Sequence, residues 1–519
     1  MATGSGNISI VGERAAFFWA GCVAISAGVL LHLPMLAMAH SMDNHLKGMP
    51  MDGGMWLGMA LIAIGVPLAC FGALPKVRGH HSDDAGTDYE APDSTPLGRW
   101  HAATLLVLTL GLVIDVMKPA TLGFVLPGLS AEYGIAKSEA ALLPLVALTG
   151  TTVGSFLWGW LADVYGRRVS ILLSTILFVS TAICGAMPAF AWNLVMCFLM
   201  GISAGGMLPV IYTLLAEVMP PRHRSWVLVL VGGTGLVGGY LAASGAAYVL
   251  EPVYGWRALW LQGFPSGLLL LALARFIPET PRFLAERGRL AELERMQHRF
   301  GLVPKPRPQQ AANSAGADAP APADHRRITA ALVTTALCWS FVNFGLLLWL
   351  PSDLQARGYS AAVASGILAK SSLLALPTIL LAAFFYARRS SKWTLVGTVG
   401  LTVIGLVGAL LPPAVLSWEP LLVAVIAVLI VGTNGTIAVL LPYTAENYPL
   451  GTRGRATGLV AGSSKFGGVA VQIAALAGFA PTLVGASLTL LVPTVVSAGL
   501  IAWFGRETQG RSLRELEAE

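Results

Sequence analysis

The stretch GWLADVYGRR, residues 159–168, decides the fold. It joins an apolar run near 140–162 to a second near 169–188, each close to the ~20 residues that a helix needs to cross about 30 Å of hydrocarbon. Glycine at 159 and 166 permits a tight turn and a close approach of two helices. Paired arginines at such a junction mark the cytoplasmic face of a membrane. The stretch therefore predicts two membrane-spanning helices joined by a cytoplasmic turn.

The composition extends this interpretation to the whole chain. Of 519 residues, 55% are hydrophobic and only 12% are charged, against about 25% charged residues in soluble proteins. A disordered or nucleic-acid-coating protein is excluded, and neither an enzyme nor a nucleic-acid partner is expected. The chain has no Walker A motif, and its five cysteines are scattered without CxxC spacing. We therefore expect no cofactor, no metal site and no direct use of ATP.

We predict an all-α integral membrane protein with a 12-helix core of two six-helix halves, preceded by two additional transmembrane helices. The additional helices are expected near 15–39 and 55–74. Alternatively, the first of them is a signal peptide, because Ala37-Met38-Ala39 resembles a cleavage site. The expected domains are an extension with two transmembrane helices and a cytoplasmic linker (1–99), the N-terminal half (100–281), a central cytoplasmic loop (282–327), the C-terminal half (328–505) and a cytoplasmic tail (506–519).

The loops that carry most of the cations all fall on one side of the predicted membrane. They include Arg167–Arg168 in the first half and Arg388–Arg389 in the second. Cytoplasmic loops are enriched in Lys and Arg, so this side and both ends of the core are predicted to be cytoplasmic. We expect a multi-pass protein of a cell membrane, the inner membrane of a bacterium.

Two motifs repeat at nearly the same offset. The pattern E-x-x-P-x-x-x-R begins at Glu217 and again at Glu446, 229 residues later, and the pair Glu-Thr begins at Glu279 and again at Glu507, 228 residues later. Parallel six-helix repeats place a substrate site near the bilayer midplane and let one half rock against the other. The repeat thus predicts a site where the halves meet.

These motifs resemble those of the major facilitator superfamily, whose pattern G-x-L-A-D-x-x-G-R-R matches residues 159–168. PETPRFL (278–284) and RETQGRSL (506–513) resemble its sugar-porter, organic-ion and aromatic-acid symporter branches. The resemblance covers about residues 100–516 and implies a cytoplasmic gate that holds the outward-facing state. Alternatively, these arginines only set the topology. The predicted gate residues are Gly159, Asp163, Gly166, Arg167, Arg168, Glu217, Arg224, Glu446 and Arg453. The corresponding loop of the second half, YARRSSKW, has no acid and no glycine, so a weaker latch is expected there.

Four charged residues lie well inside predicted spans: Asp115, Lys118, Lys370 and Lys465. Each costs about 2.5–3.5 kcal/mol at the bilayer centre on insertion scales, so such residues are functional candidates. Lys370 and Lys465 have no acidic partner in their own spans, and a cavity that both face favours an anionic substrate. Alternatively, Asp115 and Lys118 neutralise each other across one helix turn, and the other two lysines snorkel or bond backbone carbonyls.

Further candidates follow from the repeat and from aromatic residues. Asp115 corresponds to Asn343 in the second half, which pairs a carboxylate with an uncharged amide. Tyr212 and Trp339 are candidates for the aromatic wall of a substrate site, although such residues more often serve packing. The related family often carries an arginine where this chain has Cys197, so proton coupling is expected to rest on Asp115.

The loop after the first span is rich in histidine and methionine, including His40, Met42, His45 and Met49. Imidazole and thioether groups suit copper. The alternative that we favour is an ordinary loop between two helices that pack beside the core or contact a partner protein.

The sequence thus predicts a secondary active transporter that works by alternating access, as a proton-coupled symporter of a small organic anion. Its expected partners are that substrate, protons and lipid. The alternatives are a drug or metabolite efflux antiporter and a non-transporting sensor or metal-responsive membrane protein.

Overall fold

Apolar runs of this length fold into helices because a bilayer offers no water to the backbone, so each N–H and C=O must be satisfied within its own segment. The structure is a computed structural model that describes residues 14–42, 44–74, 87–306, 323–448, 450–479 and 481–509. Within these residues, fourteen helical stretches are long and apolar enough to cross a membrane. The predicted all-α membrane fold with two extra N-terminal helices is confirmed.

The first part of the chain comprises the extension, the N-terminal half and the central loop. The extension holds α1 Ala15–Leu30, α2 Leu33–His40, α3 Gly53–Ala73 and β1 Thr87–Glu90. The N-terminal half holds α4 Arg99–Tyr133, α5 Lys137–Ala140, α6 Leu142–Tyr165, α7 Arg167–Ser180, η2 Thr181–Ala186, α8 Phe190–Ala204, α9 Met207–Val218, α10 Pro221–Tyr254, η3 Trp256–Trp260, α11 Gly263–Leu273 and η4 Ala274–Phe276. The central loop holds α12 Pro281–Glu286, α13 Leu290–Phe300 and β2 Val303–Pro306.

The C-terminal half repeats the arrangement of the first. Its elements are α15 Ala323–Ser340, the π-helical segment η6 Phe341–Leu347, α16 Leu350–Ala356, α17 Ala361–Ala375, α18 Thr378–Arg388, α19 Ser391–Gly408, α20 Pro413–Leu416, α21 Glu419–Glu446, α22 Leu450–Leu476 and α23 Leu483–Phe504.

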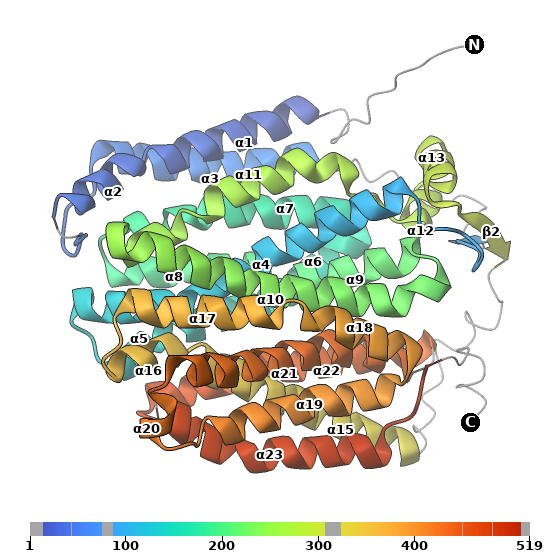
Figure 1. The fold of residues 1–519 in the computed structure, drawn as a ribbon. Helices are drawn as coiled ribbons and strands as arrows, with labels where there is room; N and C mark the ends of the chain where they lie inside the picture. The colour runs from blue at the N-terminus through green and yellow to red at the C-terminus, as the bar shows by residue number, and fades with distance from the viewer. Residues whose placement is uncertain are drawn as a thin grey trace.

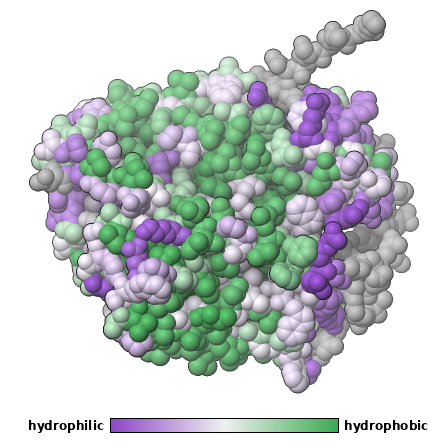
Figure 2. Space-filling view, in the orientation of Figure 1, coloured by the Kyte–Doolittle hydropathy of each residue, from purple (hydrophilic) through white to green (hydrophobic). Residues whose placement is uncertain are grey.

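The long helices run roughly side by side along one direction (Figure 1). The end that carries α12, α13 and β2 is the predicted cytoplasmic end, and α2, α5, α16 and α20 lie at the opposite, outer end. Apolar side chains gather over the middle of the surface, whereas hydrophilic ones gather at the two ends (Figure 2). The two halves meet where α10 packs against α17, α18 and α21, and where α6 packs against α22.

The extension packs as a tight helical hairpin beside α7. A Cβ on Gly21 of α1 would stand 2.6 Å from the carbonyl oxygen of Gly65 in α3, and one on Gly28 would stand 2.6 Å from that of Gly58. Small residues let membrane helices approach to backbone contact, where van der Waals packing holds them together. These glycines therefore fix the two extra helices against each other.

The extension is also attached to the core at both ends of the membrane. At the outer end, the backbone N–H groups of Leu46 and Lys47 donate to Oε1 of Glu132, at 2.7 and 2.9 Å. At the cytoplasmic end, β1 pairs antiparallel with β2 of the central loop. The extension is thus fastened to the N-terminal half rather than tethered loosely beside it.

Candidate functional site

Asp115 and Lys465 form a charged pair between the two halves. Asp115 lies midway along α4 and is only 5% exposed, and Lys465 lies midway along α22 and is partly buried. Each acts electrostatically on the other, although the charged atoms are too far apart for a direct ion pair. Neither side chain forms a hydrogen bond or an ion pair with any other described residue. Each half thus contributes one ionisable group at mid-depth, and the two groups are near enough to interact electrostatically.

The helix beside this pair departs from α-helical geometry. Residues Phe341–Leu347 form a π-helical segment, a rare conformation that is frequent at functional sites. The extra residue per turn leaves the carbonyl of Phe344 available to the amide of Gln472 in α22, at 2.8 Å, and Oε1 of Gln472 accepts from the indole of Trp349 at 3.2 Å. Asn343, inside the segment, is partly buried, and its amide bonds no described residue. This segment supplies uncharged polar groups to the C-terminal side of the interface.

The halves touch on both sides of the charged pair. Towards the outer end, the hydroxyl of Tyr240 in α10 donates to the carbonyl of Leu347 at 3.3 Å. Towards the cytoplasm, the hydroxyl of Ser225 at the start of α10 donates to the carboxylate of Glu446 at the end of α21, at 2.8 Å. The halves are therefore joined by one hydrogen bond towards the outer end and another towards the cytoplasmic end.

At the cytoplasmic end of the N-terminal half, Glu279 caps the first turn of α7. Its carboxylate accepts the backbone N–H groups of Arg167 at 2.9 Å and of Arg168 at 3.2 Å. Gly166 precedes them with φ +103°, and a Cβ there would collide with the Glu279 carboxylate. Burial raises the pKa of Glu279, and the N–H groups of Thr280 and Arg167 act in the opposite direction. A carboxylate at a helix N-terminus complements the free N–H groups and the helix dipole.

The Arg167 side chain joins three elements of this gate. It lies 3.4 Å from Asp163 at the end of α6 and 3.8 Å from Glu217 at the end of α9, and it donates to the carbonyl of Ala162 at 3.3 Å. Asp163 is 75% exposed, so the Asp163 pair is screened by water and contributes little alone. The better-buried Glu217 makes Arg167 a bridge between α7 and α9.

The C-terminal half has a corresponding network built from hydroxyl groups. Glu507 accepts the backbone N–H of Ser391 at 2.8 Å and its hydroxyl at 2.7 Å, and also bonds the hydroxyl of Ser390. Burial alone would raise the pKa of Glu507, but these hydrogen bonds outweigh it and lower the pKa. Glu446 accepts from Tyr386 at 2.7 Å and from Thr508 at 2.6 Å. Hydroxyl donors replace the arginines of the first half, so the two halves close the cytoplasmic side by different chemistry.

The sequence pattern of the Major Facilitator Superfamily matches residues 108–471. The chain belongs to this superfamily. It is a transporter and not an enzyme, as the composition and the family resemblance predicted.

Relatives within the superfamily include transporters of small aromatic compounds. The niacin transporter NiaP of Acinetobacter baylyi is 28% identical over 444 residues, which is 82% of this chain and 98% of that protein. The putative niacin/nicotinamide transporter NiaP of Bacillus subtilis is 28% identical over 381 residues, 73% of this chain and 86% of that protein. The 4-hydroxybenzoate transporter PcaK of A. baylyi is 29% identical over 228 residues, 42% of this chain and 49% of that protein.

Solved structures of other proteins share the fold of this chain. The proton:xylose symporter XylE, bound to 6-bromo-6-deoxy-D-glucose, superposes with a TM-score of 0.62 at 20% identity over 80% of this chain and 98% of that chain. At this identity the match supports the superfamily fold and leaves the substrate open.

The prediction that Lys370 lines the central cavity of the transporter is wrong. Its ammonium group is 2.6 Å from the carboxylate of Glu419, and the two side chains are 63% and 47% exposed. Glu419 opens α21, and the long lysine side chain extends along the protein surface to reach it. The surplus of positive charge inferred from two inward-facing lysines is therefore absent, and Lys465 has Asp115 as its electrostatic partner.

We expect Lys370→Gln to keep the transport rate within about twofold of the unmodified protein, because an exposed ion pair contributes little. Uptake into proteoliposomes measures this effect. A loss of uptake as large as that caused by replacing Lys465 would show that Lys370 belongs to the substrate site.

Lys118 also lies away from the interface between the halves. Its ammonium donates to the carbonyl of Phe178 at 2.7 Å and to the hydroxyl of Thr181 at 2.5 Å, inside the N-terminal half. It is 0% exposed and stacks over the Phe178 ring at 4.5 Å. Although Lys118 lies only three positions after Asp115, it neither joins the site nor pairs with that carboxylate.

Two aromatic candidates belong to the interiors of the halves. The Trp339 indole lines a cavity of about 10 Å³ among hydroxyl side chains of α15, α19, α21 and α23, including Thr433, and its Nε1 has no described partner. That volume suits one water molecule. The Tyr212 hydroxyl is buried against Gly232 of α10. The structure thus places both side chains in packing roles.

Two predicted gate residues, Arg224 and Gly159, differ from expectation. Arg224 pairs at 3.3 Å with Glu90 of the extension, rather than with Glu217. A Cβ on Gly159 would meet open space, so the close approach expected there occurs at Gly166 instead. The Arg453 side chain donates to the carbonyl of Tyr448 at 3.3 Å. The linker at the end of the extension therefore takes part in the cytoplasmic network.

Glu279 is the gate residue that the prediction omitted. The sequence did contain a signal for it, because Glu279-Thr280 recurs as Glu507-Thr508. In the structure both carboxylates cap the helix that follows the second span of their half, α7 or α19. A repeated Glu-Thr pair at the end of each half thus indicated a paired capping role.

Proposed function

We propose that the protein is a proton-coupled symporter that imports a small aromatic monocarboxylate across the inner membrane of a bacterium. The observation that carries the proposal is the Asp115–Lys465 pair at mid-depth, with one ionisable group from each half. The substrate site lies between them, and the Asn343 amide contributes a hydrogen bond to it.

The proposed coupling between proton and anion follows from the balance of charge between Asp115 and Lys465. When Asp115 is ionised, Lys465 is already compensated, and an entering carboxylate meets a negative neighbour. When Asp115 is protonated, Lys465 is left uncompensated and attracts the carboxylate. An uncompensated charge near the bilayer centre costs about 2.5–3.5 kcal/mol, and about 1.4 kcal/mol corresponds to tenfold in affinity. Protonation is therefore expected to strengthen anion binding by about a hundredfold, so proton and anion travel together.

The substrate class rests on the relatives together with this chemistry. Niacin and 4-hydroxybenzoate, named for two of the relatives, are each an aromatic ring with one carboxylate and one polar group on the ring. A single lysine matches one carboxylate, and an amide such as Asn343 can bond a ring nitrogen or hydroxyl.

A substrate screen in proteoliposomes tests the proposal. We expect nicotinate and 4-hydroxybenzoate to enter when the outside is more acidic, and nicotinamide, xylose and cationic drugs to enter at least about tenfold more slowly, because they offer no carboxylate to Lys465. Transport of a cationic drug against its gradient, in exchange for protons, would instead support the efflux antiporter.

The variant Asp115→Asn separates binding from coupling. An amide resembles the protonated acid, so we expect exchange of labelled for unlabelled substrate to persist and to become independent of pH between 5.5 and 8, a range of about a few hundredfold in proton concentration. Accumulation driven by a pH gradient is expected to vanish. Lys370→Gln serves as the control, since it changes an exposed charge. Unchanged pH dependence in Asp115→Asn would remove Asp115 from the coupling mechanism.

A further inference from the structure

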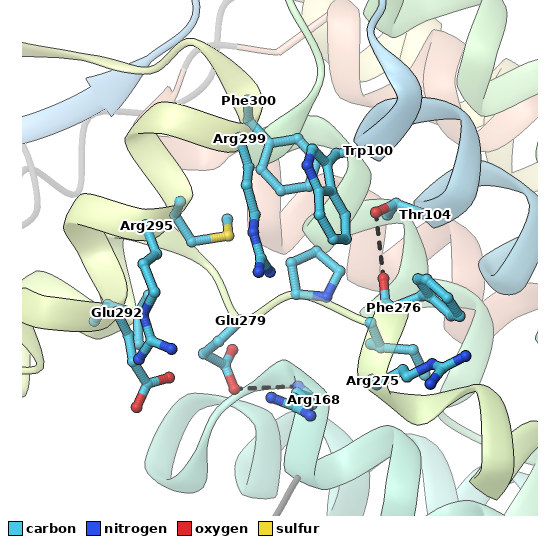
Figure 3. Close-up of a pocket in the computed structure, with 14 residues that line it drawn as sticks. Trp100, Thr104, Arg168, Arg275, Phe276, Glu279, Glu292, Arg295, Arg299 and Phe300 are labelled. Carbon is cyan, nitrogen blue, oxygen red and sulfur yellow. Dashed lines mark hydrogen bonds between the residues drawn. The ribbon is translucent and has the colours of Figure 1, made fainter. Parts of the chain in front are cut away.

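A second candidate site lies at the cytoplasmic end of the N-terminal half, away from the charged pair. It is a cavity of about 50 Å³ between the start of α4, the start of α7, the turn 275–279 and α13 (Figure 3). A cavity needs a volume of about 10–15 Å³ to hold one water molecule. The cavity therefore holds a few water molecules or one compact polyatomic anion, and it is too small for a nucleotide.

Arginine dominates the lining of this cavity. Arg168, Arg275, Arg295 and Arg299 line it with two acids, Glu279 and Glu292. Glu292 lies 2.6 Å from Arg289, outside this set, and Glu279, which accepts backbone N–H groups of α7, acts electrostatically on Arg168, so four arginines outnumber two acids. None of the four lining arginines forms an ion pair with another described residue. The cavity therefore carries positive charge that its own acids do not neutralise.

Arg168 supplies the clearest sign of a missing ligand. Its side chain is only 9% exposed, yet Nε and Nη2 are buried without a partner among the described residues. Leaving buried donors unmatched costs about 1–3 kcal/mol, and more when the group is charged. Nε and one Nη present two parallel N–H groups, the arrangement that bonds two oxygens of a carboxylate or phosphate. These donors are placed for an oxyanion.

The opposite wall of the cavity comes from α13 and is held by aromatic contacts. Arg299 stacks on the Trp100 ring at 4.1 Å, and Phe300 packs edge-on against His101 of α4 at 5.0 Å. Burial and the neighbouring Arg295 lower the pKa of Arg299, so two cations lie close together on this wall. An anion here would bond α13 and α7 at once.

We propose that this cavity binds a phosphate group, either the headgroup of an anionic lipid or free inorganic phosphate, and that the group joins α13 to the cytoplasmic gate. The bound group bridges Arg168, next to the Glu279 cap, and Arg295 and Arg299 on α13. Phosphate suits the site because three or four oxygens can match several arginines around it. Occupancy strengthens the attachment of the central loop to the N-terminal half.

Thermal unfolding of the full-length protein in nanodiscs tests this site. In discs of phosphatidylcholine alone, sodium phosphate is titrated at constant ionic strength, balanced with sodium chloride. We expect the unfolding midpoint to rise with phosphate concentration. In R295Q/R299Q the half-saturating phosphate concentration is expected to be about tenfold higher or more, because two charge-assisted contacts are lost. The double variant R388Q/R389Q is the matched control, because it removes two exposed cytoplasmic arginines from the other half and is expected to respond like the unmodified protein.

A second arm identifies the source of the phosphate group. In discs that contain phosphatidylglycerol, a lipid ligand raises the midpoint of the unmodified protein and abolishes its response to added phosphate, and R295Q/R299Q loses this gain. If free phosphate is the ligand, the titration is the same in both kinds of disc. R295K/R299K keeps both positive charges, so it is expected to recover part of the phosphate affinity that R295Q/R299Q loses. Such a recovery would show that the loss in R295Q/R299Q comes from weaker binding and not from misfolding. Equal phosphate responses in R295Q/R299Q and R388Q/R389Q, or no response of the unmodified protein in either disc, would refute the site.

Discussion

Replacing Lys465 with glutamine is expected to abolish substrate uptake, by at least about a hundredfold at every pH. The change removes the cation that binds the carboxylate when Asp115 is protonated, and when Asp115 is ionised its charge repels an anionic substrate. The loss of an attractive contact and the gain of a repulsive one together exceed about 2.8 kcal/mol, or a hundredfold. Uptake of labelled nicotinate into proteoliposomes from pH 5.5 to 8 measures the effect.

A second variant distinguishes lost function from lost folding. Lys465→Gln leaves a buried carboxylate uncompensated, so its unfolding midpoint is expected to fall as well. The double variant Asp115→Asn/Lys465→Gln removes both charges and is expected to recover stability without recovering uptake. Should the double variant transport normally, the pair would be structural, and the proposed substrate site would lie elsewhere.

The largest effect on stability is expected at the outer end, where Arg257 in η3 and Glu132 at the end of α4 form an ion pair. Their charged atoms are 2.6 Å apart, and the side chains are 1% and 2% exposed. Arg257 also donates to the carbonyls of Gly185 and Met187, each at 2.9 Å. Arg257→Ala leaves the Glu132 charge buried, at a cost of about 3–5 kcal/mol. We therefore expect the unfolding midpoint in detergent to drop on the order of 10 °C.

The same change should loosen the extension, because Glu132 also accepts the N–H groups of Leu46 and Lys47. Limited proteolysis of the loop between α2 and α3 measures this, and faster cleavage is expected. Lys370→Ala is the control, since Lys370 pairs with Glu419 at the outer end and the two side chains are 63% and 47% exposed; its effect on the unfolding midpoint is expected to be small. Equal shifts in the two variants would mean that the buried pair contributes no more than an exposed one.

Counting along the apolar runs was enough to locate Asp115 and Lys465 at mid-depth, because a helix rises by a fixed 1.5 Å per residue. The same counting placed Lys370 and Lys118 at similar depth, yet the first pairs with Glu419 on the surface and the second bonds Thr181 inside its own half. Depth is a property of one helix. The direction in which a side chain points depends on how that helix is rotated against its neighbours, which hydropathy does not report.

The cytoplasmic gate shows the same difference between what the sequence predicts and what the packing of the helices decides. Residues 159–168 identified the turn and its arginines, and Gly166 does adopt the positive φ that favours glycine. The partners were less predictable, since Arg224 bonds Glu90, 134 residues away, and the helix cap comes from Glu279, more than a hundred residues beyond Arg167. The second half replaces the arginines with Ser390, Ser391 and Tyr386, whose roles only the fold reveals.

The sequence by itself determined the membrane class, the fourteen spans and the repeat of the two halves, and it predicts the orientation of the spans. Each of these follows from hydropathy, charge and spacing read along the chain, because a bilayer acts on every segment separately. The tertiary structure alone decided which buried charges face each other, how the extension is fastened at both ends, and that the arginines around the cytoplasmic cavity converge. Those features depend on contacts between segments distant in sequence, and such contacts arise only when the helices pack.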